Sequence, residues 1–422
     1  MSQAVKLSAS TPIPWYREVA PGAWWALALA GTGWTFDVFD TFLLALTLPV
    51  LTEVFALDRA SAGSIGSLLA AGLVLGGIGF GWLADRIGRV RSLVGCVAIY
   101  SLFSGLTAIA PTAAMLAWLR FAAGLGMGGT WTAGAALVAE SWGTRHRGKG
   151  GALMQMGLPI GSMLAIAAAA LTGAAMGGLS GNGWRVLYAL GVLPILPVLA
   201  LARFTPESPL WQKPAPRPAT LGLEGAAPPA GAGQPGGLVV AFLFIFFCQY
   251  IYWGVFTWTP SFLIAVKHLT FVHGLGFVLA QQIGSLAGFL GFAALVDRLG
   301  RRQSFLLYLF IGALAVAIFV TATTAAVLVV AIFWSGFGIT GLFAGMGPFT
   351  AEMVPTAGRR GLGMGLAYNG GRLGGILAPW LIGALATDTL GFQLGMATNI
   401  AAFGFAAIVI WMAPETRGTV LG

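Results

Sequence analysis

Long runs of apolar residues, separated by short polar and glycine-containing segments, dominate the chain from residue 23 onward. Each run has the roughly 20 residues, or more, that an α-helix needs to cross the hydrocarbon core of a bilayer. We therefore expect an all-α membrane protein. The pattern predicts twelve membrane-spanning helices, at residues 23–50, 61–84, 91–110, 113–141, 149–175, 184–204, 238–266, 274–296, 302–320, 323–353, 361–387 and 391–413.

A change of composition divides these spans into two sets of six. Residues 205–237 are rich in Pro, Gly and Ala and contain few large apolar side chains, so they predict a cytoplasmic linker that does not pack. The sequence thus predicts an N-terminal six-helix bundle at residues 1–204 and a C-terminal six-helix bundle at residues 238–422.

The two sets of spans share repeated motifs. Asp85-Arg86-Ile87-Gly88-Arg89 recurs as Asp297-Arg298-Leu299-Gly300-Arg301, a displacement of 297 − 85 = 212 residues. Pro206-Glu207-Ser208 after the sixth span recurs as Pro414-Glu415-Thr416 after the twelfth. Parallel six-helix repeats are the architecture of transporters in which two bundles rock about a site at mid-membrane. The repeats therefore predict two pseudo-symmetric bundles.

Composition supports a surface that meets lipid. Apolar residues make up 58% of the 422 residues, charged residues only 8%, and the mean hydropathy is +0.87. Soluble domains carry about 25% charged residues, because their surface must meet water. We expect a multi-pass protein of a bacterial inner membrane, with the lipid bilayer as its surroundings.

The net charge of +9 comes from basic residues whose positions indicate the topology of the chain in the membrane. Of the 22 basic residues, 17 lie in alternate loops or at the termini, whereas Arg59, Arg185 and Lys267 lie in or beside the intervening loops. An excess of Lys and Arg in alternate loops marks the cytoplasmic side, which predicts that both termini are cytoplasmic. This distribution gives no reason to expect a nucleic-acid partner.

Other classes of site have no support in the sequence. Cys96 and Cys248 lie in apolar runs, and no cluster of His and Cys has the spacing of a metal site. No nucleophile and base are paired as an enzyme would need, so we expect no enzymatic activity and no cofactor. The glycine-rich runs 124–129 and 361–371 follow no strand, so they favour close helix contacts over nucleotide binding.

Two acids and one arginine within the spans indicate proton coupling. Ionisable groups deep in a bilayer cost at least about 2.5 kcal/mol, so they are functional candidates. Asp37 and Asp40 share a helix face, about 22 and 27 Å from the cytoplasmic end, and Arg120 lies about 31 Å in. We predict that Asp37 and Asp40 carry or relay the proton and that Arg120 tunes them. The alternative is a static ion pair that joins the first and fourth helices.

Arg372 in the eleventh span indicates an anionic substrate. It lies about 18 Å from the cytoplasmic end, and its own span contains no acid. A guanidinium matches a carboxylate with two parallel hydrogen bonds, so we predict that Arg372 and Asn369 hold the substrate. The alternative for Arg372 is pairing with an acid of another helix or with carbonyl groups. The predicted cavity wall consists of amides and aromatic residues of the seventh and eighth spans, Gln249, Tyr252, Trp253, Gln281 and Gln282, although such residues also serve in packing.

The repeated turns predict a cytoplasmic gate that breaks when that side opens. Asp85 and Asp297 are expected to bind helix ends or neighbouring arginines. Acids that recur at the same offset are expected to pair nearby, Glu140 with Arg145 or Arg147, and Glu352 with Arg359 or Arg360. The predicted gate comprises Asp85, Arg86, Arg89, Glu140, Arg145, Asp297, Arg298, Arg301, Glu352 and Arg359.

The paired Asp-Arg-x-Gly-Arg turns resemble those of the major facilitator superfamily. Within it, the segments 13–17 (Ile-Pro-Trp-Tyr-Arg), 37–40 (Asp-Val-Phe-Asp), 140–142 (Glu-Ser-Trp) and 368–379 are similar to the sialate and lactate proton symporters, particularly bacterial sialate permeases. The Asp-x-Phe-Asp element is also similar to the aromatic acid proton symporters. This resemblance implies proton-driven import of a carboxylate.

Together these features predict a monomeric symporter that imports a small organic acid anion with protons. The alternative is a proton-coupled drug or metabolite exporter of the same fold. Exporters tend to have a Gly-Pro motif in the fifth helix, of which residues 157–161 (Gly-Leu-Pro-Ile-Gly) are a loose version.

Overall fold

The structure is a computed structural model that describes residues 14–57, 59–212, 235–267, 271–354, 357–386 and 388–418. Within these ranges every regular element is a helix. Ile13, the first residue of the segment 13–17 that resembles the symporters, lies outside the described residues, as do residues 213–234 of the predicted linker.

The N-terminal half forms helices that follow the predicted spans closely. The predicted spans 149–175 and 184–204 are each two helices in tandem. Pro194 lies at the break between the second pair, where the missing N–H of a proline interrupts a helix. The helices are α1 (Trp15–Glu18), α2 (Pro21–Val54), α3 (Arg59–Ile87), α4 (Arg89–Thr107), α5 (Ala113–Ser141), α6 (Arg147–Gln155), α7 (Gly157–Met176), α8 (Gly183–Leu190), α9 (Ile195–Ala202) and α10 (Pro209–Gln212).

The C-terminal half repeats the plan of the first. Gly88 and Gly300 begin the tight connections α3–α4 and α12–α13 with φ angles of 104° and 91°, which glycine adopts without the strain of a Cβ. The two repeated motifs therefore form the same turn. The helices are α11 (Pro235–Ala265), α12 (Phe271–Leu299), α13 (Arg301–Thr321), α14 (Ala325–Met353), α15 (Ala357–Leu385) and α16 (Thr389–Met412).

Ten stretches of the described helices are long and apolar enough to cross a membrane. The two remaining long helices, α5 and α15, have 29 residues each, and their glycines and arginines lower their hydropathy. The predicted count of twelve spans and the cytoplasmic position of the termini stay predictions, as do the domain boundaries at residues 204 and 238.

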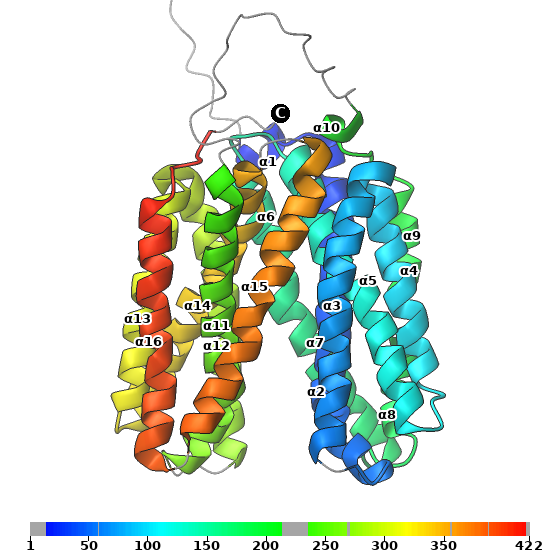
Figure 1. Ribbon diagram of the computed structural model, residues 1–422, viewed down its shortest axis with the longest axis vertical. Helices are drawn as coiled ribbons and strands as arrows, with labels where there is room; N and C mark the ends of the chain where they lie inside the picture. The colour runs from blue at the N-terminus through cyan, green and yellow to red at the C-terminus, as the bar shows by residue number, and fades with distance from the viewer. Residues whose placement is uncertain are drawn as a thin grey trace, which may run out of the picture.

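Figure 1 shows two groups of long, roughly parallel helices standing side by side, which we call the N-terminal bundle (α2–α9) and the C-terminal bundle (α11–α16). One end carries α1, α10 and the last turn of α16 (Figure 1). The two repeated turns lie at the same end, which we call the turn end. Here the bundles meet, because α3 packs on α15 while α6 packs on α12 and α14.

Glycines bring α3 and α15 into direct backbone contact near the turn end. A Cβ placed on Gly81 would meet the carbonyl of Gly361, and one placed on Gly361 would meet the carbonyl of Gly81. Small residues permit such an approach between membrane helices. The glycine-rich run 361–371 therefore has a packing role, as expected, and the bundles are closed at this end.

Candidate functional site

A cavity of about 400 Å³ lies between the two bundles. Its lining comes from α2, α3, α7, α11, α14 and α15, and it is mostly aliphatic and aromatic. On α3 the lining residues lie between Gly66 and Val74, in the half remote from the turn end, and on α15 they run from Tyr368 to Ile376. The cavity therefore occupies the middle of the molecule and the half opposite the turn end. Its aromatic residues are Trp34, Phe42, Tyr252, Trp253, Phe343 and Tyr368.

Asp37 of α2 and Arg372 of α15 are the charged residues among those that line this cavity in the described part of the chain. They lie at one level, because Asp37 is about 24 Å from the first residue of α2 and Arg372 about 22 Å from that of α15 at the helical rise. Asp37 Oδ2 and Arg372 Nη1 are buried, and neither has a hydrogen-bond partner within the described residues. The apolar cavity thus holds an unsatisfied charged acceptor and an unsatisfied charged donor, from opposite bundles. The indole Nε1 of Trp34, which also lines the cavity, is a further buried donor without a partner among the described residues.

Asp40, one turn further along α2, lies in a different environment. Its Oδ2 accepts a hydrogen bond from Arg120 Nη1 at 2.8 Å, and its Oδ1 accepts one from Ser104 Oγ. Arg120 also donates to Thr107 Oγ1 at 2.8 Å and stacks on the ring of Tyr188, with 4.6 Å between Cζ and the centroid. Asp40 and Arg120 do not line the cavity. They form a buried ion pair whose polar atoms are bonded within the N-terminal bundle.

The predicted substrate residues divide into two groups. Gln249, Tyr252 and Trp253 line the cavity, and Trp253 Nε1 donates to Gln249 Oε1 at 3.1 Å. Gln281 and Gln282, which we expected in the cavity wall, do not line it. On α12 their amides donate instead to hydroxyl groups, Gln281 to Ser335 at 3.4 Å and Gln282 to Ser162 at 3.1 Å.

Asn369, which we expected beside the substrate, also lies outside the cavity lining. Its Nδ2 donates to the Gly365 carbonyl at 3.1 Å and approaches Thr132 Oγ1 of α5 at 3.5 Å. A step of one residue turns a helix by about 100°, so Tyr368 lines the cavity while the amide of Asn369 points towards Thr132 on α5. The sequence reveals which helix carries these side chains but not the rotation of that helix against its neighbours.

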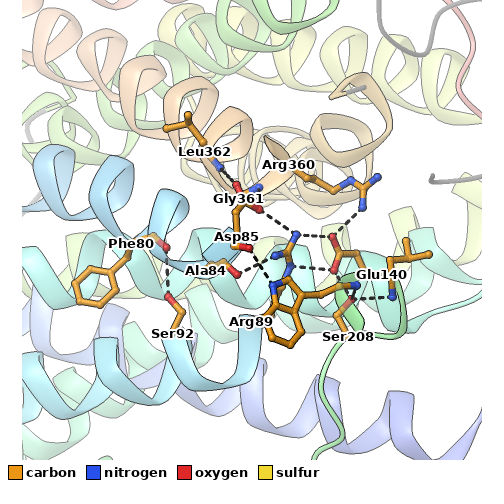
Figure 2. Close-up of polar contacts among 12 residues, drawn as sticks. Phe80, Ala84, Asp85, Arg89, Ser92, Glu140, Ser208, Arg360, Gly361 and Leu362 are labelled. Carbon is orange, nitrogen blue, oxygen red and sulfur yellow. Dashed lines mark hydrogen bonds and ion pairs between the residues drawn. The ribbon is translucent and has the colours of Figure 1, made fainter. Parts of the chain in front are cut away.

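Figure 2 shows the first of two ionic clusters at the turn end, where Glu140 of α5 lies between two arginines. Arg89 donates two hydrogen bonds of 3.0 Å to the carboxylate, and Arg360 of α15 donates one of 2.8 Å. Asp85 accepts hydrogen bonds from the N–H groups of Gly361 and Leu362, each at 3.0 Å. Asp85 therefore binds the beginning of α15, as we expected of a helix-end ligand, and the cluster ties the two bundles together.

The second cluster is the counterpart of the first. Glu352 of α14 binds Arg301 at 3.1 Å and Arg147 of α6 at 3.2 Å, and Thr416 Oγ1 donates to it at 2.5 Å. Asp297 pairs with Lys149 of α6 and lies 3.5 Å from Arg301. Each cluster thus contains a basic residue from the other bundle.

The expected pairing of Glu140 with Arg145 or Arg147, and of Glu352 with Arg359 or Arg360, is wrong. The arginines exchange across the interface, so that Arg360 binds Glu140 and Arg147 binds Glu352. Four predicted gate residues lie outside the clusters. Arg86 is exposed and stacks on Trp82, and Arg298 and Arg359 are exposed. Arg145 is 76% exposed and binds Glu18 at 2.8 Å.

Glu18 ties the short helix α1 to the turn end. The hydrogen bond to His146, together with the charge of Arg145, holds the pKa of Glu18 below its ordinary value. Trp15 of the same helix lies 5.6 Å, centroid to Nζ, from Lys149, the residue that pairs with Asp297. The N-terminal segment therefore packs beside a contact between the bundles.

Two further acids that we did not assign stabilise the repeated turns. Glu207 accepts hydrogen bonds from the N–H groups of Arg89 and Val90, at 2.8 and 3.1 Å. Glu415 accepts the equivalent bonds from Arg301 and Arg302, at 2.9 and 3.0 Å. Carboxylates at the first turn of a helix satisfy free N–H groups there. The repeat of Pro-Glu-Ser as Pro-Glu-Thr was the signal that could have identified them.

Replacing Arg360 by Ala is expected to weaken closure at the turn end. Truncating one partner of a buried charge pair costs about 2–5 kcal/mol, which can shift a two-state equilibrium tenfold or more. Thiol labelling from the turn side, at a cysteine placed at cavity residue Leu158, should therefore increase at least about tenfold. Arg359→Ala, which removes the exposed neighbouring arginine, is the control and should leave labelling unchanged. Equal labelling of both variants would remove Glu140 and Arg360 from the gate.

Residues 23–294 and 274–420 match the model of a family described as Major Facilitator Superfamily. A probable 4-methylmuconolactone transporter of Cupriavidus pinatubonensis is 31% identical over 415 residues, which cover 96% of this chain and 94% of that protein. The sialic acid transporter NanX of Escherichia coli is 29% identical over 407 residues, which cover 94% and 95%.

A solved structure of the proton:xylose symporter XylE, bound to 6-bromo-6-deoxy-D-glucose, has the same fold. It superposes with a TM-score of 0.77 at 18% sequence identity and covers 94% of this chain and 97% of that one. The resemblance to bacterial sialate permeases seen in the motifs agrees with the similarity to NanX.

Proposed function

The chain belongs to the major facilitator superfamily, and from this premise we propose that it is a proton-coupled symporter that imports a small organic acid anion by alternating access. It is a multi-pass membrane transporter and not an enzyme, and its bacterial relatives agree with a place in the inner membrane. One observation carries the proposal. Asp37 Oδ2 and Arg372 Nη1, both without a hydrogen-bond partner among the described residues, line one apolar cavity between the bundles.

Arg372 is the proposed carboxylate ligand. The guanidinium offers parallel N–H groups to a carboxylate, and the mostly apolar lining of the cavity strengthens such a pair. The aromatic and aliphatic lining favours a compact acid with an apolar body. Of the compounds for which the relatives are named, 4-methylmuconolactone suits this mostly apolar lining better than sialic acid, which carries several hydroxyl groups.

Asp37 is the proposed proton carrier, and charge balance supplies the reason. Without substrate the cavity holds one negative and one positive charge, Asp37 and Arg372. A bound carboxylate adds a second negative charge, which is costly inside a membrane unless Asp37 takes up a proton. The cavity is then neutral both with substrate and without it, and in either state the protein can change between its outward-open and inward-open conformations. A cavity with substrate alone or proton alone carries a net charge and is disfavoured, which couples the two fluxes.

The ionic clusters at the turn end support a gate on the cytoplasmic side. Both clusters join the bundles, whereas the cavity extends into the opposite half of the molecule. This arrangement corresponds to a state that is closed towards the cytoplasm. Opening that side would require Arg360 to leave Glu140 and Arg147 to leave Glu352. Asp40 and Arg120, bonded away from the cavity, fit the static ion pair better than a proton relay.

Transport in liposomes tests the direction of this proposal. Purified protein in liposomes with an inwardly directed proton gradient should accumulate labelled 4-methylmuconolactone, or another acid selected by thermal shift, above its outside concentration. Collapse of the gradient with a protonophore should abolish accumulation. If an inwardly directed proton gradient instead drives the compound out of the liposomes, against its own concentration gradient, the protein is the proton-coupled exporter.

A further inference from the structure

Trp131 of α5 and Tyr368 of α15 stack on each other across the interface between the bundles. Their ring centroids are 3.5 Å apart, and the ring planes are inclined by only 12°. Both side chains are buried, with exposed fractions of 0% for Trp131 and 3% for Tyr368. Among the aromatic contacts of the described residues, this pair has the shortest separation of centroids and joins opposite bundles.

Gln155, at the end of α6, makes a second link at the same place. Trp131 Nε1 donates to Gln155 Oε1 at 3.1 Å, and Gln155 Nε2 donates to the carbonyl of Phe343 on α14, also at 3.1 Å. The amide thus connects an indole of the N-terminal bundle to the backbone of the C-terminal bundle. Separation of the bundles here would break the stack and at least one hydrogen bond together.

The stack lies between the cavity and the turn end. Tyr368 and Phe343 line the cavity, whereas Trp131 does not. At the helical rise, Trp131 lies about 15 Å from the turn end of α5 and Tyr368 about 17 Å from that of α15. Arg372 lies one helical turn further on, and its guanidinium carbon is 5.4 Å from the centroid of the Tyr368 ring. Tyr368 therefore lines the cavity on the side of the turn end, and its ring lies beside Arg372, the residue proposed to bind the carboxylate.

We propose that Trp131 and Tyr368 form the inner gate of the transport pathway, and that Gln155 holds Trp131 in its closed position. A substrate bound at Arg372 can leave towards the cytoplasm only after this stack separates. The face of Tyr368 is stabilised by Arg372, because a guanidinium over a phenol ring is attracted by its π-electrons. A bound carboxylate that draws Arg372 away from the ring weakens this contact. Substrate binding therefore makes the stack of Tyr368 on Trp131 easier to separate. Trp131 is thus a positioning residue that acts through Tyr368.

Site-specific thiol labelling tests this gate. The alternating-access cycle is taken from the proposed function, but the labelling requires no substrate. The full chain carries cysteine at the cavity position Leu158 and alanine in place of Cys96 and Cys248, and it is labelled with a membrane-impermeant maleimide from either side of oriented vesicles. Trp131→Leu should increase cytoplasmic labelling about three- to tenfold, the shift that loss of one aromatic pair produces in a two-state equilibrium. Trp131→Phe, which keeps a ring but loses the N–H, should give a smaller increase, as should Gln155→Leu.

Phe337→Leu is the matched control. Phe337 stacks on Tyr308 with 5.0 Å between centroids and planes 14° apart, but both residues belong to the C-terminal bundle. Its loss should lower thermal stability without changing the side from which Leu158→Cys is labelled. Unchanged cytoplasmic labelling in Trp131→Phe and Gln155→Leu would overturn the gate, whether or not Trp131→Leu folds. If these variants show the expected increase in labelling but the parent protein shows no gradient-driven uptake, the proposed function is overturned and the gate still stands.

Discussion

Replacing Asp37 by Asn is expected to abolish accumulation driven by a proton gradient while exchange of substrate across the membrane continues. The amide occupies the space of the carboxyl group but cannot bind or release a proton. It therefore mimics the protonated form, in which the cavity with substrate is neutral and free to reorient. Uptake and counterflow of labelled substrate in liposomes measure the two activities.

Asp40→Asn is the matched comparison on the same helix face. Asp40 is bonded to Arg120 and Ser104, so its loss leaves a buried arginine without a counter-charge. Breaking such a pair costs about 3–5 kcal/mol, so we expect a fall in thermal stability and a proportional loss of all transport modes. Gradient-driven accumulation that survives in Asp37→Asn would remove Asp37 from the coupling mechanism. Selective loss of coupling in Asp40→Asn, with stability retained, would transfer that role to Asp40.

Replacing Arg372 by Ala is expected to abolish detectable substrate binding. A carboxylate held by a guanidinium in a cavity of low polarity loses about 2–5 kcal/mol when that partner is truncated, which corresponds to roughly a 30- to 5,000-fold weaker affinity. Lysine keeps the positive charge but lacks the two parallel N–H groups of a guanidinium, so Arg372→Lys should bind with intermediate affinity. Calorimetry in detergent on the parent and both variants measures this series.

Arg359→Ala serves as the control for the Arg372 variants, since it removes an exposed arginine from the same helix α15. Its affinity should equal that of the parent. Parent-like affinity in Arg372→Ala would return Arg372 to a structural role, in which Asp37 on the facing bundle is its partner.

The architecture follows from the sequence because its causes are local. Apolar runs about 20 residues long predict spanning helices, and a span can be located without knowledge of its neighbours. Counting residues along two helices was enough to predict that Asp40 lies level with Arg120, and the two are bonded at 2.8 Å. The repeated turns 85–89 and 297–301 likewise adopt the same conformation, because glycine occupies the same position in each.

The contacts between bundles could not be predicted in this way. They depend on how far each helix is rotated and on which bundle it meets, and neither is encoded by spacing within one segment. The exchange of Arg147 and Arg360 between Glu352 and Glu140 is one example, since each acid has arginines nearby in its own half. The displacement of Asn369 from the cavity is another. The stack of Trp131 on Tyr368 joins residues 237 positions apart, 368 − 131, which carry no shared motif.

We expect one proton to enter with each carboxylate, because Asp37 is neutralised when Arg372 binds substrate. The most direct measurement is the alkalinisation of a weakly buffered outside medium during substrate influx into liposomes, recorded together with the amount of labelled substrate taken up. We expect one proton per substrate anion in the parent, influx that a membrane potential alone does not drive, and no proton movement during exchange by Asp37→Asn. Substrate influx without alkalinisation, or alkalinisation of the same size in Asp37→Asn, would contradict this coupling.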